Sequence, residues 1–114
     1  MDLRLKRVYD EPSEEDGFRV LVDRLWPRGL TKERAAVDLW AKEAAPSTEL
    51  RRAFHYDGMD WETFDAAYRG ELALNPAVEE LRAAIEGKPV VTLLYGAQDA
   101  IRNHAEILSE LLRA

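Results

Sequence analysis

Two short, almost uninterrupted apolar runs constrain the fold of this chain more than any other feature. The first covers residues 18–22 and is broken only by Arg19, and the second covers residues 89–96. Runs without polar alternation are typical of strands buried on both faces, as in parallel sheets covered by helices. The two runs therefore predict central parallel strands in an α/β domain.

The remaining segments predict the other elements of this domain. Apolar and basic residues alternate over residues 3–9, which predicts a first strand near one edge of the sheet, and similar alternation predicts a further strand over residues 37–43. Five further segments are each preceded by a residue that can cap a helix. The five capping residues are Thr31, Ser47, Asp60, Asn75 and Asp99. In the helix after Asp99, the predicted inner face consists of Ile101, Ala105, Leu108 and Leu112.

This order of elements predicts one domain over residues 1–114. We expect a small, mostly parallel sheet of about four strands flanked by helices, in a Rossmann-like three-layer arrangement. The acidic, turn-rich residues 10–17 are interpreted as a solvated connection at the sheet edge.

Composition excludes several classes of function. The chain has no cysteine, so a thiolate nucleophile, a disulfide and a zinc–thiolate site are all excluded. No apolar run approaches the ~18 residues of a membrane span, and residues 1–6 lack a signal-peptide core, so we expect a cytoplasmic protein without membrane attachment. The net charge of -6 argues against broad electrostatic capture of nucleic acid, although it allows a local basic pocket.

Polar and charged side chains follow both apolar runs. Since the carboxyl ends of parallel strands meet at one edge of a sheet, we expect these two loops to share a crevice. Guanidinium groups bind phosphate and carboxylate in a bidentate fork, so the predicted ligand is a small anion, bearing a phosphate or a nucleotide. The predicted proton-transfer groups are Asp23 and His104, and the predicted ligand-binding residues are Arg24, Trp26, Arg28, Lys32, Tyr95, Asp99, Arg102 and Asn103.

Structural roles for these residues remain open at this point. Asp23 with Arg24, or Asp38 with Arg28, would serve equally well as ion pairs that fix loops. His104 would serve equally well as a hydrogen-bonding partner of the backbone. His55 is interpreted as a partner of a helix C-terminus, and because no close-spaced ligand pair accompanies the histidines, we predict neither a metal nor a cofactor.

Other polar and aromatic residues carry weaker signals. Trp40, Trp61 and Tyr68 are interpreted as core aromatics rather than as platforms for bases, and Asp38 and Glu71 are further candidates for a general base or a ligand clamp. A short loop from Gly96 to Arg102 is similar to the phosphate cradle of rhodanese-like and cysteine phosphatase domains, but their cysteine is absent.

The chain resembles the YeaO-like branch of the DUF488 proteins over nearly its whole length. The resemblance lies in the string Asp-Arg-Leu-Trp-Pro-Arg-Gly at residues 23–29, in residues 91–95, and in Asn103-His104-Ala105. It implies a small cytoplasmic α/β domain. Other DUF488 branches carry Cys-His-Arg in place of residues 103–105, so a role that requires that cysteine or arginine does not carry over.

Three hypotheses follow for the function. The leading one is a small-molecule site for an anion, and whether this site is catalytic is left open. The second is a nucleic-acid-binding or regulatory module, in which arginines beside a tryptophan grip phosphates and stack on a base. The third is a protein-interaction domain without a ligand.

Overall fold

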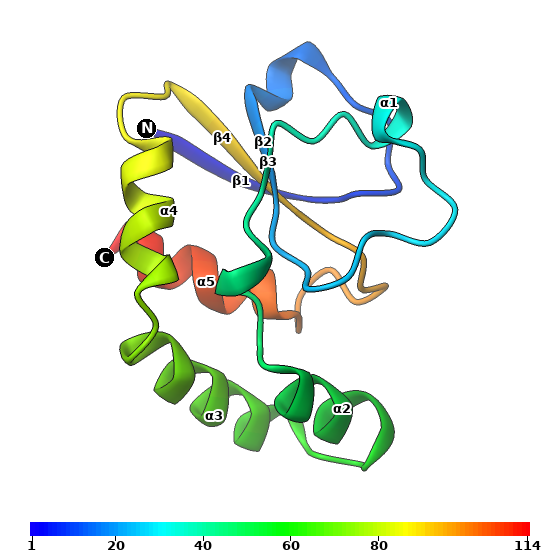
Figure 1. Cartoon of the computed structure of the whole chain (residues 1–114), viewed down its shortest axis with the longest axis vertical. Coiled ribbons are helices and arrows are strands. Elements are labelled where there is room, and N and C mark those ends of the chain that lie inside the picture. Colours follow the sequence, from blue (N-terminus) through cyan, green and yellow to red (C-terminus); the bar gives the residue numbers. More distant parts are fainter.

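The computed structural model describes residues 1–114, and its centre is a four-stranded sheet in which every pair of neighbours is parallel (Figure 1). The strands are β1 (Asp2–Arg7), β2 (Phe18–Leu21), β3 (Leu39–Trp40) and β4 (Val90–Tyr95), in the order β1-β4-β2-β3. The predicted pairing of the two apolar runs is confirmed, because β2 lies beside β4 with Phe18 opposite Val91. The predicted edge position of the first strand is confirmed as well.

Five α-helices and two short 3-10 helices connect and cover the strands. The α-helices are α1 (Lys32–Ala35), α2 (Thr48–Tyr56), α3 (Trp61–Ala73), α4 (Ala77–Ile85) and α5 (His104–Arg113), and the 3-10 helices are η1 (Glu14–Asp16) and η2 (Lys42–Ala44). The predicted caps Thr31, Ser47 and Asp60 are confirmed, since each side chain accepts a hydrogen bond from a backbone N–H in the first turn of its helix. No helix has the length and apolar character that crossing a bilayer requires.

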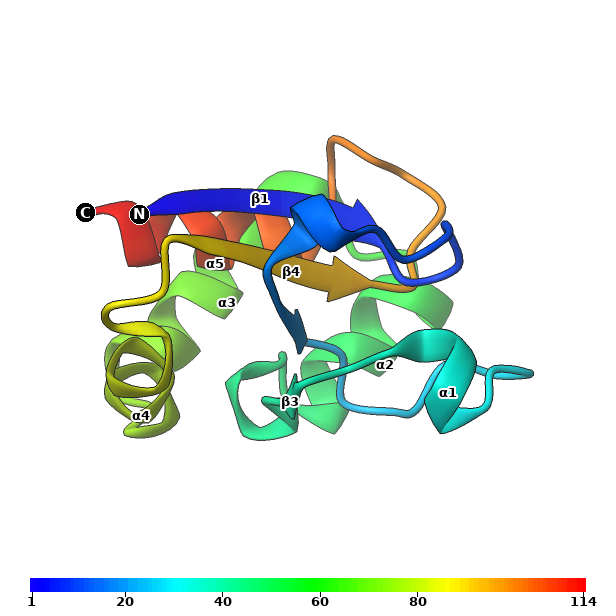
Figure 2. The ribbon, with the colours of Figure 1, turned by 90° about the horizontal axis from the view of Figure 1, so that it is seen from above.

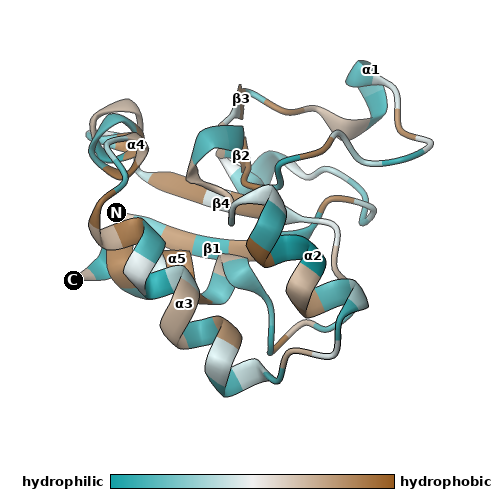
Figure 3. Cartoon of the chain, turned by 60° about the horizontal axis from the view of Figure 1, so that its bottom comes forward, coloured by the Kyte–Doolittle hydropathy of each residue, from teal (hydrophilic) through white to brown (hydrophobic).

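The two faces of the sheet are covered unequally. Alternate residues of β2 and β4 point to opposite faces. Val20 and Leu93 belong to a main cluster of 19 buried residues built with α2, α3, α4 and α5, whereas Leu21 and Leu94 belong to a cluster of four. Figure 1 shows α1 apart from the other helices, and Ala35 of this helix belongs to the smaller cluster. Figure 3 shows β4 coloured almost entirely as hydrophobic, as expected for a strand covered on both faces.

The strand predicted over residues 37–43 is shorter than expected. Only Leu39 and Trp40 pair with β2, and the N–H of Ala41 still donates to the Leu21 carbonyl before η2 begins at Lys42. The alternation in sequence continues, but the partner strand ends at Leu21, so the ladder has nothing further to pair with.

The start of the last helix was also predicted wrongly. Asn103, not Asp99, caps α5, and its side chain accepts a hydrogen bond from the N–H of Glu106. The Asp99 carboxylate instead accepts from the N–H groups of Ile101 and Arg102 in the preceding turn. Ile101 is therefore outside the helix, and it is 78% exposed rather than part of the inner face.

The connection between β1 and β2 is more than a solvated loop. Four of its five carboxylates are exposed, but Asp16 is buried and forms ion pairs with Arg19, at the centre of the sheet, and with Lys6. Arg19 also donates to the carbonyls of Ala35 and Ala36, so it links this connection to the end of α1. At the next position, Gly17 has φ +63°, and a Cβ there would lie 2.4 Å from the carbonyl oxygen of Val90, so only glycine fits.

Candidate functional site

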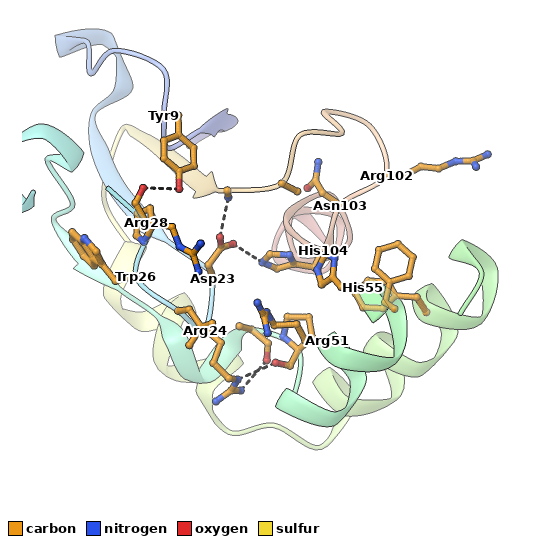
Figure 4. Close-up of a pocket in the computed structure, with 18 residues that line it drawn as sticks. Tyr9, Asp23, Arg24, Trp26, Arg28, Arg51, His55, Arg102, Asn103 and His104 are labelled. Carbon is orange, nitrogen blue, oxygen red and sulfur yellow. Dashed lines mark hydrogen bonds and ion pairs between the residues drawn. The ribbon is translucent and has the colours of Figure 1, made fainter. Parts of the chain in front are cut away.

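A cavity of about 360 Å³ lies where the carboxyl ends of β1, β2 and β4 meet the start of α5 and one side of α2 (Figure 4). Figure 2 shows β1 and β4 pointing the same way, toward the loops that contribute to it. The structure brings seven of the ten predicted site residues to this cavity: Asp23, Arg24, Trp26, Arg28, Arg102, Asn103 and His104. Arg28 and His104, which are 76 positions apart in sequence, line the same space, as the parallel-strand argument predicted.

Three predicted site residues do not line the cavity. Lys32 begins α1 and is exposed, while Asp99 is exposed in the turn before α5. Tyr95 points into the main core, where it is 4% exposed and burial raises the pKa of its hydroxyl. Their positions in sequence were close to the strand ends, but the direction of each side chain follows from the pleat and from turn geometry.

Of the cavity residues, Asn103 and Trp26 are committed to other contacts, and Arg102 points away from the rest. Asn103 is 2% exposed, and its amide caps α5 while donating to the Asp99 carbonyl. Arg102 lines the mouth, but Figure 4 shows its guanidinium extended away from the other labelled side chains. Trp26 donates to the Leu30 carbonyl and packs edge-on against Trp40, which fixes the loop after β2.

Asp23 and His104 form the polar centre of the cavity. Oδ2 of Asp23 accepts from the Gly96 N–H at 2.9 Å, and Oδ1 lies 3.1 Å from Nε2 of His104. The same Nε2 lies 2.9 Å from the carbonyl oxygen of Val22. Oδ1 is buried and receives no hydrogen bond of good geometry, so the approach of Nε2 is its one ion-pair contact. The predicted backbone contact of His104 is confirmed, and the ring also lines the cavity, where proton transfer stays a prediction.

The cavity contains far more positive than negative charge. Its only carboxylate is Asp23, whereas four arginines and two histidines line it. Arg24 donates to the carbonyls of Pro46 and Ala45 and lies 3.7 Å from Glu43, so its guanidinium is committed to holding the chain before α2. The side chains of Arg28 and Arg51 form neither an ion pair nor a hydrogen bond, and the alternative pairing of Arg28 with Asp38 does not form.

Known proteins are similar to this chain over its whole length. A family model described as "Inactive DUF488-N3 subclade" matches residues 2–114. The chain belongs to the DUF488 family. "Uncharacterized protein YeaO" of Escherichia coli is 47% identical to it over 114 residues, which cover 100% of this chain and 99% of that protein. An uncharacterised protein of Mycobacterium tuberculosis is 40% identical over 110 residues, which cover 96% and 92%. No solved structure matches.

In this DUF488 chain, the polar contacts of His104 define which ring nitrogen carries a proton. The Val22 carbonyl and the Asp23 carboxylate can only accept, so Nε2 must donate. Nδ1 makes no hydrogen bond to the protein, so it is the nitrogen that remains for a ligand or a proton. Nδ1 can therefore accept a hydrogen bond when the ring is neutral and donate one when the ring is charged.

Several residues of the DUF488 pocket were missed by sequence reasoning. Arg51, Phe54 and His55 come from one side of α2, and Tyr9 comes from the end of β1. Burial, followed by the positive charges of Arg51 and His104, lowers the pKa of His55. A signal was present for α2, because Arg51 and His55 are four residues apart and so share one helical face, but nothing in the sequence placed that face beside the strand ends.

The rim of the pocket is held by side chains of the first strand. Arg7 donates to the carbonyls of Gly96 and Ala97, and Tyr9 donates from its hydroxyl to the Arg28 carbonyl. Of the other candidate bases, Asp38 accepts from the Arg19 N–H, and Glu71 accepts from the N–H and hydroxyl of Ser47. Neither lines the pocket. The described residues contain no group of three side chains arranged to hold a metal.

Proposed function

We propose that the pocket binds a small anionic molecule that carries a phosphate or carboxylate group. The observation that carries this proposal is that the guanidinium groups of Arg28 and Arg51 line a concave site and form no ion pair with a carboxylate. In a chain of net charge -6, two unpaired guanidinium groups in one cavity are an unusual concentration of positive charge. Each can bind an oxyanion through two parallel hydrogen bonds.

The rest of the pocket supports the same kind of ligand. Phe54 and Phe64 provide apolar wall beside the charged groups, as in most small-molecule sites. Nδ1 of His104 offers a further hydrogen bond, and the rim contacts of Arg7 and Tyr9 hold the pocket open before a ligand arrives. A cytoplasmic location, expected from the sequence, supplies abundant phosphates and carboxylates.

Binding, rather than covalent catalysis, is the proposed role. The chain lacks cysteine, and its family model is described as an inactive subclade. Where other DUF488 branches carry arginine, Ala105 is fully buried in the main core and leaves no space for a guanidinium. Asp23 and His104 keep their predicted capacity for proton transfer, which a screen for turnover of any bound ligand would detect.

The test is a thermal-shift and calorimetric screen of phosphate, nucleotides and dicarboxylates. We expect at least one anion to raise the melting temperature of the wild-type protein, and Arg28→Ala and Arg51→Ala to lose that effect. The matched control is Arg34→Ala, which removes one exposed arginine of α1 that makes no ion pair and lies outside the pocket. If no anion stabilises the wild type, or if Arg34→Ala weakens binding as much as Arg28→Ala, the proposal is wrong.

A further inference from the structure

We infer that the ligand carries two adjacent anionic groups and belongs to the class of organic diphosphates, such as a nucleoside diphosphate. This inference rests on the proposed function and adds a second binding position to it. A shallow groove adjoins the pocket and shares four lining residues with it, among them Arg28 and Arg51. Arg52, Thr48 and Tyr56 line the groove alone.

The groove has the charge of an anion-binding surface. Four of its seven lining residues are arginines, and none is a carboxylate. Arg24 is committed to the Pro46 and Ala45 carbonyls, but Arg52 is exposed and, like Arg28 and Arg51, makes no ion pair. The cationic surface therefore continues beyond the pocket, and a single phosphate held inside would leave Arg52 without an anion to bind.

The order of the arginines indicates how two groups would be shared. Arg51 and Arg52 are consecutive in α2, so they project about 100° apart, and Arg51 contributes to both hollows while Arg52 contributes only to the groove. One anionic group between Arg28 and Arg51 and a second between Arg51 and Arg52 would use the three unpaired guanidinium groups that line the groove. Two phosphates joined by one bridging oxygen offer two adjacent oxyanion groups, each of which a guanidinium group can bind through two parallel hydrogen bonds.

The surroundings favour a small molecule over a polynucleotide. Phe64 of α3 and His104 of α5 line the pocket, so a ligand body that enters it meets packed helices on that side. At the other end, Tyr56 is 72% exposed and lies one turn after Arg52, where its ring can cover a flat organic group attached to the outer phosphate.

The experiment compares pyrophosphate with inorganic phosphate by titration calorimetry on the full chain at constant ionic strength. We expect pyrophosphate to bind on the order of tenfold more tightly, the gain of about one charge-assisted hydrogen bond. Arg52→Ala should abolish this preference while leaving phosphate affinity unchanged, and Arg34→Ala should preserve the preference. Arg52 is exposed and its side chain forms no ion pair, so the variant should melt at the wild-type temperature.

The outcomes separate the two proposals. If phosphate binds but pyrophosphate gains nothing, or if Arg52→Ala keeps the preference, the second position is refuted and the anion pocket stands. If neither anion binds, the diphosphate inference fails, and the anion pocket fails with it unless the screen finds a carboxylate that binds. Tighter binding of a single-stranded oligonucleotide than of pyrophosphate, with an affinity that falls more steeply with salt, would overturn the inference in favour of a nucleic-acid surface.

Discussion

The carboxylate of Asp23 accepts a hydrogen bond from the backbone N–H of Gly96 at 2.9 Å, and this bond joins the ends of β2 and β4 beneath the pocket. A Cβ added to Gly96 would lie 2.9 Å from the same carboxylate oxygen, so the two chain segments approach more closely than a side chain at this position would permit. The other oxygen of Asp23 faces Nε2 of His104. One side chain thus fixes both the floor of the site and the orientation of its histidine.

We expect Asp23→Asn to lower the free energy of unfolding by about 1–3 kcal/mol, because the new amide would place an N–H donor against the Nε2–H of His104. Urea denaturation measures this loss. The matched control is Asp38→Asn, which keeps an oxygen for the Arg19 N–H and meets no second donor, so it should change stability little. Equal stability of the two variants would contradict the proton assignment of His104.

Asp16 should contribute to stability at neutral pH and lose its contribution in acid. Burial raises the pKa of this carboxyl, but hydrogen bonds from the Ser13 N–H, Lys6 and Arg19 outweigh burial and bring the pKa below its usual 3.8. The folded state therefore binds fewer protons than the unfolded chain, so the stabilisation is complete above about pH 5 and declines as the pH falls through the lowered pKa. We expect Asp16→Ala to cost about 3–5 kcal/mol at pH 7, because it leaves Arg19 buried without its partner.

Glu14→Ala is the control for this prediction. Glu14 belongs to the same 3-10 helix as Asp16, but it is exposed and forms no ion pair. Its removal should leave the chemical denaturation midpoint almost unchanged at pH 7. A loss as large as that of Asp16→Ala would mean that the helix, rather than the buried ion pair, provides the stabilisation.

Anion binding should strengthen as the pH falls below 6.5. The pKa of His55 is lowered by burial and by the charges of Arg51 and His104, so the ring is neutral at pH 7 and gains a proton more readily when an anion is beside it. Asp23 is the one nearby charge that acts in the opposite sense. We expect sulfate, whose own charge is constant, to bind severalfold more tightly at pH 5.5 than at pH 7.5, with proton uptake visible by calorimetry.

His55→Gln tests the role of His55 in this experiment. The variant should lose most of the pH dependence of sulfate binding. Sulfate affinity that is identical at both pH values in the wild type would show that His55 does not face the anion.

Loss of the Asn103 cap should destabilise the carboxyl-terminal helix, α5. We expect Asn103→Ala to cost about 1 kcal/mol or more, because the Glu106 N–H loses its acceptor and a buried amide is removed. Asp99→Ala should cost less, since that carboxylate supports only an exposed turn. Thermal unfolding of the two variants provides the comparison, and the reverse order of stability would restore Asp99 as the cap.

The central strands and most helix starts were predictable because local patterns determine them. The apolar runs of β2 and β4 require cover on both faces, and Thr31, Ser47 and Asp60 supply oxygens where backbone N–H groups lack partners. From these alone it follows that Arg28 and His104 lie at the same edge of the sheet. The cap of α5 was not predictable in this way, because Asp99 and Asn103 are both good capping residues and the choice depends on how β4 and α5 pack.

The composition of the pocket was only half predictable. Residues that directly follow a buried strand, such as Asp23 and Arg28, were placed correctly by topology. Arg51 and His55 were not, because they reach the pocket only through the packing of α2 against α3 and the main core. Arg19 escaped notice for the opposite reason, since its position inside an apolar run gave no hint that Asp16 would neutralise it.

The strand order has a consequence for the growing chain on the ribosome. β1 lies at the edge of the sheet and pairs only with β4, whose residues are made some 88 positions later. During synthesis, therefore, the first strand stays without its hydrogen-bonding partner until nearly all of the protein has emerged. The anion pocket also depends on β4, so it is one of the last parts of the molecule to form. A chain that ends before β4 would lack the pocket altogether.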